Sequence, residues 1–194
     1  MNVYILLDRS GSMSTLWNEA IGSINGYVAN LKKTDKIHLA VFDSVSHDVM
    51  RDCKVKDWKD VSDKEVEPRG GTPLYDSCGK VMAVAEADKA KKTVLVVMTD
   101  GYENSSKEHT QASIKAKVKS FEDRKWEVVF LGANFDSVES VSGSVGVASG
   151  KTLNYGAGNF ARGMDVLAAS TMAYASAGTA VNFTADDKTS LQNK

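Results

Sequence analysis

Hydroxyl and carboxylate side chains gather in three short stretches of the chain. The five residues concerned are Asp8, Ser10 and Ser12 in the first stretch, Thr72 in the second and Asp100 in the third. All five side chains offer hard oxygen donors, and neither histidine nor cysteine is among them. Such a set suits Mg²⁺, Mn²⁺ or Ca²⁺ better than zinc or copper. The residue types therefore predict a divalent-metal site, with Mg²⁺ as the first candidate.

The spacing of the first stretch supports this prediction. Ser10 and Ser12 are two residues apart, so in an extended loop their side chains point the same way. Gly11 between them and the glycine pair 70–71 in the second stretch allow sharp turns. The two carboxylates only neutralise a dication. If they hold waters and hydroxyls around the metal, the metal lacks one ligand, and an Asp or Glu of a partner protein would supply it.

The elements that must position these residues are visible as alternating apolar and amphipathic segments. Val3–Leu7 and Thr93–Met98 are apolar, which predicts two strands that are covered by other elements on both faces. Further strands are expected over 37–42, 45–50, 127–131 and 152–155, and helices over 14–32, 73–90, 107–124, 135–150 and 159–177. This alternation predicts an α/β fold: a doubly wound, mostly parallel six-stranded sheet with helices on both faces and one antiparallel edge strand. In such a sheet, ligands bind beyond the carboxyl ends of the strands, where the first and third stretches fall.

Asp8-x-Ser10-x-Ser12, Gly-Gly-Thr72-Pro-Leu and Thr-Asp100-Gly, in this order, resemble the metal-ion-dependent adhesion site of von Willebrand factor A (VWA) domains. The surrounding pattern is similar to the Rossmann-like sheet of that family. The resemblance implies that Ser10, Ser12 and Thr72 bind the metal through their hydroxyls, while Asp8 and Asp100 act directly or through water. Three motifs in register with the predicted strands are far more specific than one short motif.

The pattern extends over most of the 194 residues without an internal repeat. We expect one VWA-like domain over residues 1–180 and a loose, polar C-terminal tail over residues 181–194. The Leu131–Asn134 stretch and the short strand at 152–155 with its following helix resemble small intracellular bacterial and phage members of the family.

The amino-acid composition argues against some classes of binding partner. The net charge is −1, from 24 basic and 25 acidic side chains, so no basic field is present for nucleic acid. No apolar run is long enough to cross a membrane, and no signal segment opens the chain. Cys53 and Cys78 have neither metal-ligand spacing nor a CxxC pair, so we expect reduced thiols, a cytoplasmic location and a chain that is monomeric when alone.

Functions of different classes remain open at this point. The first is a non-catalytic, divalent-metal-dependent module that binds a protein presenting an Asp or Glu carboxylate. The alternative is a Mg²⁺-dependent hydrolase or phosphotransferase with Asp8 as nucleophile, but that chemistry normally needs an acid/base carboxylate two residues on, where Ser10 stands. Phosphate-binding glycine-rich loops are missing as well. The balanced charge counts against a third function, nucleic-acid binding. We expect no enzyme activity.

Other polar and aromatic residues are expected to have structural roles or to lie around the metal site. The hairpin pair Asp43 and Asp48 is interpreted as solvated turn residues rather than a second metal site, and Asp76 as a charge at a helix N-terminus. The three histidines are expected to be structural or exposed. The residues expected at the rim of the metal site, where they would select the partner, are Met13, Tyr75, Tyr102 and Glu103.

Overall fold

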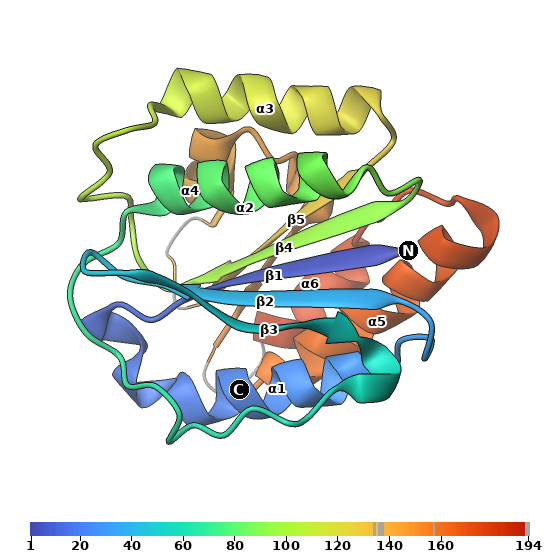
Figure 1. The fold of residues 1–194 in the computed structure, drawn as a ribbon, viewed down its shortest axis with the longest axis horizontal. Helices are drawn as coiled ribbons and strands as arrows, with labels where there is room; N and C mark the ends of the chain where they lie inside the picture. The colour runs from blue at the N-terminus through green and yellow to red at the C-terminus, as the bar shows by residue number, and fades with distance from the viewer. Residues whose placement is uncertain (134, 136–137, 157, 193–194) are drawn as a thin grey trace.

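The computed structural model, which describes residues 1–133, 135, 138–156 and 158–192, shows one six-stranded sheet between two layers of helices (Figure 1). The strand order is β3-β2-β1-β4-β5-β6. The strands are β1 (Asn2–Asp8), β2 (Lys36–Phe42), β3 (His47–Lys54), β4 (Thr93–Thr99), β5 (Glu127–Ala133) and β6 (Thr152–Tyr155). All neighbouring pairs are parallel except β2 and β3. The predicted sheet is confirmed, with β1 and β4 adjacent in its middle.

The described residues form six α-helices beside the strands. They are α1 (Trp17–Ala29), α2 (Leu74–Asp88), α3 (Gln111–Asp123), α4 (Val138–Val145), α5 (Phe160–Ala177) and α6 (Ala185–Gln192). Three short 3-10 turns, η1 (Gly11–Thr15), η2 (Val55–Asp57) and η3 (Ser149–Lys151), complete the set. None of the helices among the described residues has the length and apolar character needed to cross a membrane.

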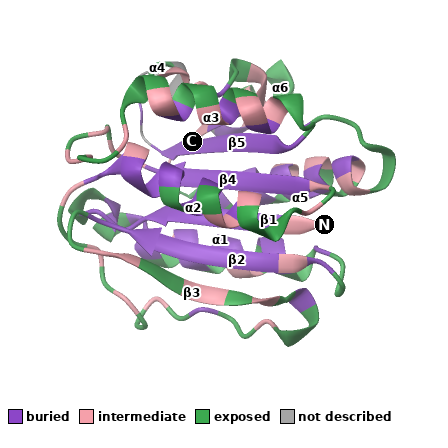
Figure 2. Cartoon of the chain, turned by 45° about the horizontal axis from the view of Figure 1, so that its top comes forward, coloured by how far each residue is buried: buried purple, intermediate pink, exposed green. Residues whose placement is uncertain are grey.

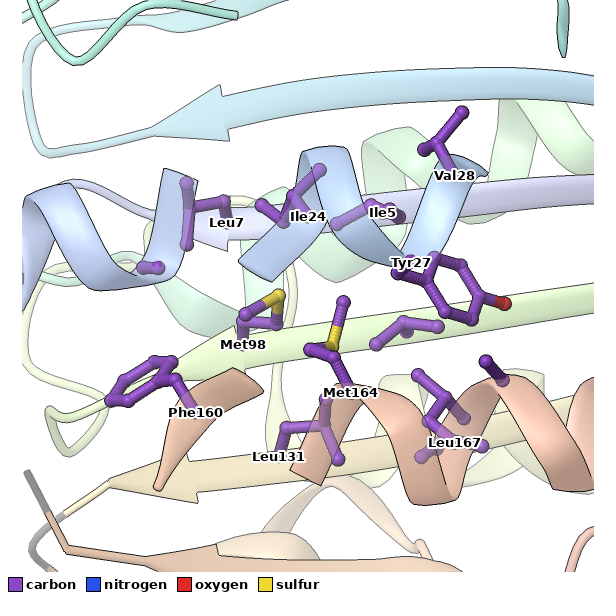
Figure 3. Packing of buried hydrophobic residues seen from close by; sticks show 14 of the residues in the cluster. Ile5, Leu7, Ile24, Tyr27, Val28, Met98, Leu131, Phe160, Met164 and Leu167 are labelled. Carbon is purple, nitrogen blue, oxygen red and sulfur yellow. The ribbon is translucent and has the colours of Figure 1, made fainter. Parts of the chain in front are cut away.

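The side chains of β1 alternate between two apolar cores, because successive residues of a strand point to opposite faces. Ile5 and Leu7 face α1 and α5, where they pack with residues such as Ile24 and Met164 (Figure 3). Leu6 faces the other way, into the core beneath α2, α3 and α4. Every residue from Val3 to Leu7 is 0% exposed. The continuous apolar run in the sequence therefore reflects burial on both faces.

The edge strand β3 differs from the central strands. Figure 2 shows β1, β2, β4 and β5 mostly buried and β3 mostly exposed or half-buried. The register of β2 against β3 shifts between Leu39 and Ala40, which marks a β-bulge. The hairpin extends further than expected, since β3 ends at Lys54, and its loop covers residues 43–46.

The expectation of a loose polar tail after residue 180 is wrong for the described residues. Residues 185–192 form α6, and three apolar side chains anchor the segment: Val181, Phe183 and Leu191 are at most 3% exposed. Phe183 N donates a hydrogen bond to Gly150 O, and Asn159 Nδ2 donates one to Leu191 O. Three apolar residues spread over eleven positions show no helical periodicity, so only tertiary packing reveals the role of this segment. Residues 193–194 lie outside the described residues.

Replacing Leu191 with alanine should lower the free energy of unfolding by about 2–5 kcal/mol, because the variant leaves a cavity against the α5 side of the sheet. Urea denaturation measures the change. The matched control is Thr189→Ala on the exposed face of α6, for which we expect a change within about 0.5 kcal/mol. Equal, small effects of the two changes would contradict the packing of α6 on the domain.

Candidate metal centre

Three loops meet at the carboxyl ends of β1 and β4, at the left of Figure 1. β1 and β4 are parallel neighbours, with Leu7 opposite Met98, so the residues that follow each strand emerge side by side. Gly11 N donates a hydrogen bond to Gly70 O, which ties the loop after β1 to the loop before α2. Strand order therefore brings the first and third predicted stretches to one place, and the bond from Gly11 to Gly70 joins the second stretch to them, as expected for a ligand site in an open α/β sheet.

The five predicted site residues lie together. The Oγ atoms of Ser10 and Ser12 are 3.1 Å apart, and Ser12 Oγ donates to Asp100 Oδ1 at 2.6 Å. Thr72 and Asp8 flank the residue after Asp100. A Cβ atom placed on Gly101 would be 2.8 Å from Thr72 Oγ1 and 3.6 Å from Asp8 Oδ2. Glycine at this position therefore leaves room for the hydroxyl and the carboxylate to approach each other.

These five residues, called the cup below, are buried on one side and open to solvent on the other. Asp8, Ser10 and Thr72 are buried, Asp100 is half-buried and Ser12 is exposed. Among the described residues, the Thr72 hydroxyl has no hydrogen-bond partner. The donor oxygens of the cup are therefore covered by protein below and open to solvent on the side of Ser12.

Asp8 is held at the bottom of the cup. Its Oδ1 accepts from Ser10 N at 2.7 Å, and its Oδ2 accepts from Thr99 Oγ1 at 2.6 Å. Burial raises the pKa of Asp8 to about 6, although these hydrogen bonds oppose the shift. Thr99 is a residue of the site that was not predicted from the sequence. The signal was present, since Thr99 stands beside Asp100 in the third motif, but its role depends on a contact across 91 positions.

Burial also raises the pKa of Asp100, against the hydrogen bond from Ser12. Within the part of the chain that the structure describes, neither Asp8 nor Asp100 has a Lys, Arg or His within ion-pair distance. Two carboxylates in a partly desolvated site without a positive partner repel each other and favour protonation. A divalent cation would supply the missing charge, and the clustered hydroxyls would supply neutral oxygen ligands. The donor set therefore fits the metal that the sequence predicts.

The residues of this centre are unlike a zinc site. Among the described residues, no group of three or more His, Cys, Asp or Glu side chains is arranged so that it could hold a metal ion. The carboxylates number only two, and the remaining donors are hydroxyls. This composition is consistent with a hard cation.

The Gly-Gly-Thr stretch is fixed by Asn104. Thr72 N donates to Asn104 Oδ1 at 2.9 Å, and Asn104 N donates to Thr72 O at 3.1 Å. Gly70 has a φ of +68°, a conformation that L side chains rarely adopt, and a Cβ there would lie 2.6 Å from Ser44 Oγ. A side chain on Gly71 would meet Asn104 Oδ1 at 2.8 Å. Both glycines are therefore required for the position of Thr72.

Two carboxylates fasten the loop that follows Asp100 to the start of α2. Glu103 accepts hydrogen bonds from the backbone N–H groups of Tyr75, Ser105 and Ser106. Asp76 accepts hydrogen bonds from the backbone N–H groups of residues 107–109. The interpretation of Asp76 as a simple helix N-terminal charge is therefore incomplete, because it binds a neighbouring loop. Glu103 is engaged inside the loop rather than offered to a partner at the rim.

A buried ionic cluster supports the loop after β1. Arg9 is 3% exposed and donates to Asp43 Oδ2 at 2.6 Å and to Asp48 Oδ2 at 2.8 Å. Arg69 Nε also donates to Asp43, at 3.0 Å. Burial opposes the charge on Asp43, but hydrogen bonds from Ser46 N and from Arg69 hold its pKa below the usual value. The interpretation of Asp43 as a solvated turn residue is therefore wrong.

The expected rim is only partly present. Met13 is 0% exposed and belongs to the core, so its assignment to the rim is wrong. Tyr102 is 56% exposed, and its ring contacts Phe135 edge to face at 5.2 Å. Tyr75 is half-buried. Of the histidines, His38 is buried in the sheet, in agreement with a structural role.

Comparison with known families matches residues 1–139 to the family described as VWA domain containing CoxE-like protein. A comparison with curated protein sequences finds no match. Among solved structures, the VWA-type domain of the pilus tip protein Mfa5 from Porphyromonas gingivalis is 10% identical with a TM-score of 0.71, covering 88% of this chain and 94% of that one. The von Willebrand factor type A protein from Catenulispora acidiphila is 14% identical with a TM-score of 0.67, covering 88% and 42%.

Proximal thread matrix protein 1 from the mussel byssus is 14% identical with a TM-score of 0.66, covering 86% of this chain and 44% of that one. This chain thus spans less than half the length of the mussel and Catenulispora proteins. At these identities the likeness concerns the fold: a Rossmann-like α/β sheet of the VWA type.

Proposed function

Because the chain belongs to the VWA domain family, whose members are generally protein-interaction modules, we propose that it binds a divalent cation and through it a carboxylate of another protein. One observation carries the proposal: Asp8 and Asp100 lie beside three hydroxyls, and neither carboxylate has a Lys, Arg or His within ion-pair distance among the described residues. Mg²⁺ is the first candidate, and Mn²⁺ or Ca²⁺ would suit the same oxygen donors.

Each residue of the centre has a defined part in this proposal. Ser10, Ser12 and Thr72 would hold the cation through their hydroxyl oxygens. Asp8 and Asp100 would bind it directly or through water. A cation held largely by neutral hydroxyls remains electrophilic and favours an additional carboxylate ligand. An Asp or Glu side chain of the partner would enter from the open side of the cup, past Ser12 and Tyr102.

We propose that the centre is not catalytic. A nucleophilic carboxylate needs a free oxygen that a substrate can reach. Asp8 is 0% exposed, and both of its oxygens already accept hydrogen bonds, from Ser10 N and from Thr99. The position two residues on is Ser10, which is no general acid or base for that reaction. These contacts count against the Mg²⁺-dependent hydrolase or phosphotransferase. A reproducible hydrolase activity that disappears in Asp8→Ala would refute the non-catalytic proposal.

We further propose that the domain is cytoplasmic, is monomeric without its partner and binds neither nucleic acid nor membranes. The free thiols of Cys53 and Cys78 support a reducing compartment. We also propose that the chain resembles small bacterial and phage members of the family. Asn134, at the end of the stretch that suggested this resemblance, lies outside the described residues.

Asp100→Ala should abolish the binding of Mg²⁺ or Mn²⁺, for which we expect one site per chain. The substitution removes one of the two carboxylates and the hydrogen bond that orients Ser12. Titration calorimetry measures the binding, and circular dichroism checks that the fold is intact. The matched control is Asp123→Ala, an exposed carboxylate on α3 that should leave the affinity unchanged. Unchanged Mn²⁺ affinity in Asp100→Ala would refute the metal assignment.

The partner is tested separately. Pull-down from a lysate of the native host, with Mg²⁺ and again with EDTA, should identify proteins whose retention depends on the metal. Ser10→Ala should release the same proteins. A partner that stays bound in EDTA and in Ser10→Ala would show that the binding surface lies elsewhere on the domain.

A further inference from the structure

A second polar pocket lies beside the metal centre, on the α2 side of the sheet. It has a volume of about 140 Å³ and is enclosed by the loop between β2 and β3, the first turns of α2 and the loop at residues 105–107. None of the five residues of the metal centre lines it. The residues that matter for its chemistry are Lys80, Lys107, His47, Ser77 and Ser105.

Two hydroxyls of lining residues have no hydrogen-bond partner within the described part of the chain. Ser77 is only 2% exposed, and among the described residues its hydroxyl makes no hydrogen bond. Ser105 Oγ is buried and also has no hydrogen-bond partner. Leaving a buried polar group unsatisfied costs about 1–3 kcal/mol. Ser77 and Ser105 are lining residues of the pocket, so a ligand there would offer their hydroxyls the missing hydrogen-bond partner.

Two lysines supply positive charge. Lys80 and Lys107 are lining residues of the pocket, and neither has a carboxylate within ion-pair distance among the described residues. His47 contributes no charge at neutral pH, because burial and the nearby charge of Lys80 lower its pKa to about 4. Its Nδ1 atom is buried without a partner, so the neutral ring can still take part in a hydrogen bond.

The two carboxylates of the pocket offset this positive charge only in part, since other groups already engage them. Asp43 binds Arg9, Arg69 and the backbone N–H groups of residues 45–46. Asp76 binds the three backbone N–H groups of residues 107–109. Two guanidinium groups therefore neutralise Asp43, while Asp76 keeps its negative charge, and the two lysines leave the pocket with an excess of positive charge and two hydroxyl donors. Such a set attracts an anion and repels a cation.

We propose that this pocket is a binding site for a phosphate-type oxyanion. Lys80 and Lys107 match the double negative charge of a phosphate group, and Ser77 and Ser105 donate hydrogen bonds to its oxygens. Donors come from α2 and from the 105–107 loop, so they meet several oxygens of a tetrahedral group better than the two of a carboxylate. The phosphate could be free or carried as a phosphomonoester on a partner protein.

The test is a titration of the ¹⁵N-labelled protein with inorganic phosphate, followed by amide chemical shifts. Using metal-free buffer and the Asp100→Ala background keeps phosphate away from any ion in the metal centre, so the result does not depend on the metal proposal. We expect saturable shifts at the amides of Ser77, Ser105 and Lys107. In the double variant Lys80→Ala/Lys107→Ala, the dissociation constant should rise about tenfold or more, because two charge-assisted contacts are lost.

The matched control is Lys32→Ala/Lys91→Ala, which removes two exposed lysines at the opposite end of the sheet and should leave the dissociation constant unchanged. The spectra themselves report whether each variant is folded. A second titration with a phosphoserine peptide identifies the source: tighter binding than inorganic phosphate indicates a carried phosphomonoester, and equal binding indicates free phosphate. The absence of saturation, shifts confined to residues 10–12, or equal affinity in the pocket variant and the control would each overturn the proposal.

Discussion

Replacing Arg9 with methionine should lower the free energy of unfolding by about 3–5 kcal/mol, because it removes one partner of a buried ion pair. The side chains of Arg9 and Asp43 are 3% and 0% exposed. Without the guanidinium, Asp43 keeps its backbone donors and Arg69, whose side chain is 52% exposed and well solvated. Urea denaturation at neutral pH measures the loss.

Two further variants separate the ion pair from simple loss of packing. Arg69→Met should cost about 1 kcal/mol or less, as expected for an exposed partner. The double variant Arg9→Met/Asp43→Asn should recover part of the loss, because it no longer leaves a buried carboxylate without its main counter-charge. A cost below about 1 kcal/mol for Arg9→Met, or no recovery in the double variant, would contradict a stabilising role for the pair.

The metal-free protein should become less stable as the pH rises through about 6. Burial raises the pKa of Asp8 above its unfolded value of 3.8, so the folded state binds this proton more tightly than the unfolded chain does. The resulting stabilisation is fully present below pH 3.8 and is lost as the pH passes the folded value. A shift of this size corresponds to about 3 kcal/mol.

Asp8→Asn isolates this effect from other titrating groups. The asparagine can accept from Ser10 N and donate to Thr99 Oγ1, and the Thr99 hydroxyl can then turn to Gly101 O, 3.2 Å away. We expect the variant to gain stability over the natural chain at about pH 7.5 but not at about pH 4. Urea denaturation in metal-free buffer at both pH values gives the difference. His38 and His47, whose pKa values are lowered by burial, contribute equally to both proteins. A difference that does not depend on pH would refute the assignment to Asp8.

Much of the sheet could be predicted because its signals are local. The run Val3–Leu7 is buried on both faces, so its composition alone identifies a central strand. The positions of Asp8 and Asp100 follow from the same logic, since each stands at the end of such a strand. Parallel pairing then places their loops together without any further information from the sequence.

The remaining features depend on contacts between distant parts of the chain. Asp43 is buried because Arg9, 34 positions away, pairs with it, and in the sequence Arg9 is merely a variable position of a motif. Met13 follows the motif directly, but the 3-10 turn η1 points it into the core. Leu191 shows no periodic pattern with its neighbours. Burial of an isolated residue is decided by the surface it meets, which the local sequence does not describe.

The bonds from Glu103 and Asp76 have a mechanical consequence. They join the loop after β4 to the first turn of α2. Thr72 lies just before α2 and Asp100 begins the loop after β4, so both residues belong to one hydrogen-bonded unit. Ser10 and Ser12 belong to a second unit, the loop after β1, which the buried ion pair of Arg9 with Asp43 stabilises. The two units meet at the hydrogen bond from Ser12 Oγ to Asp100 Oδ1, so a cation bound at the site would contact both of them. A cation bound between the two units would therefore fix the distance between them.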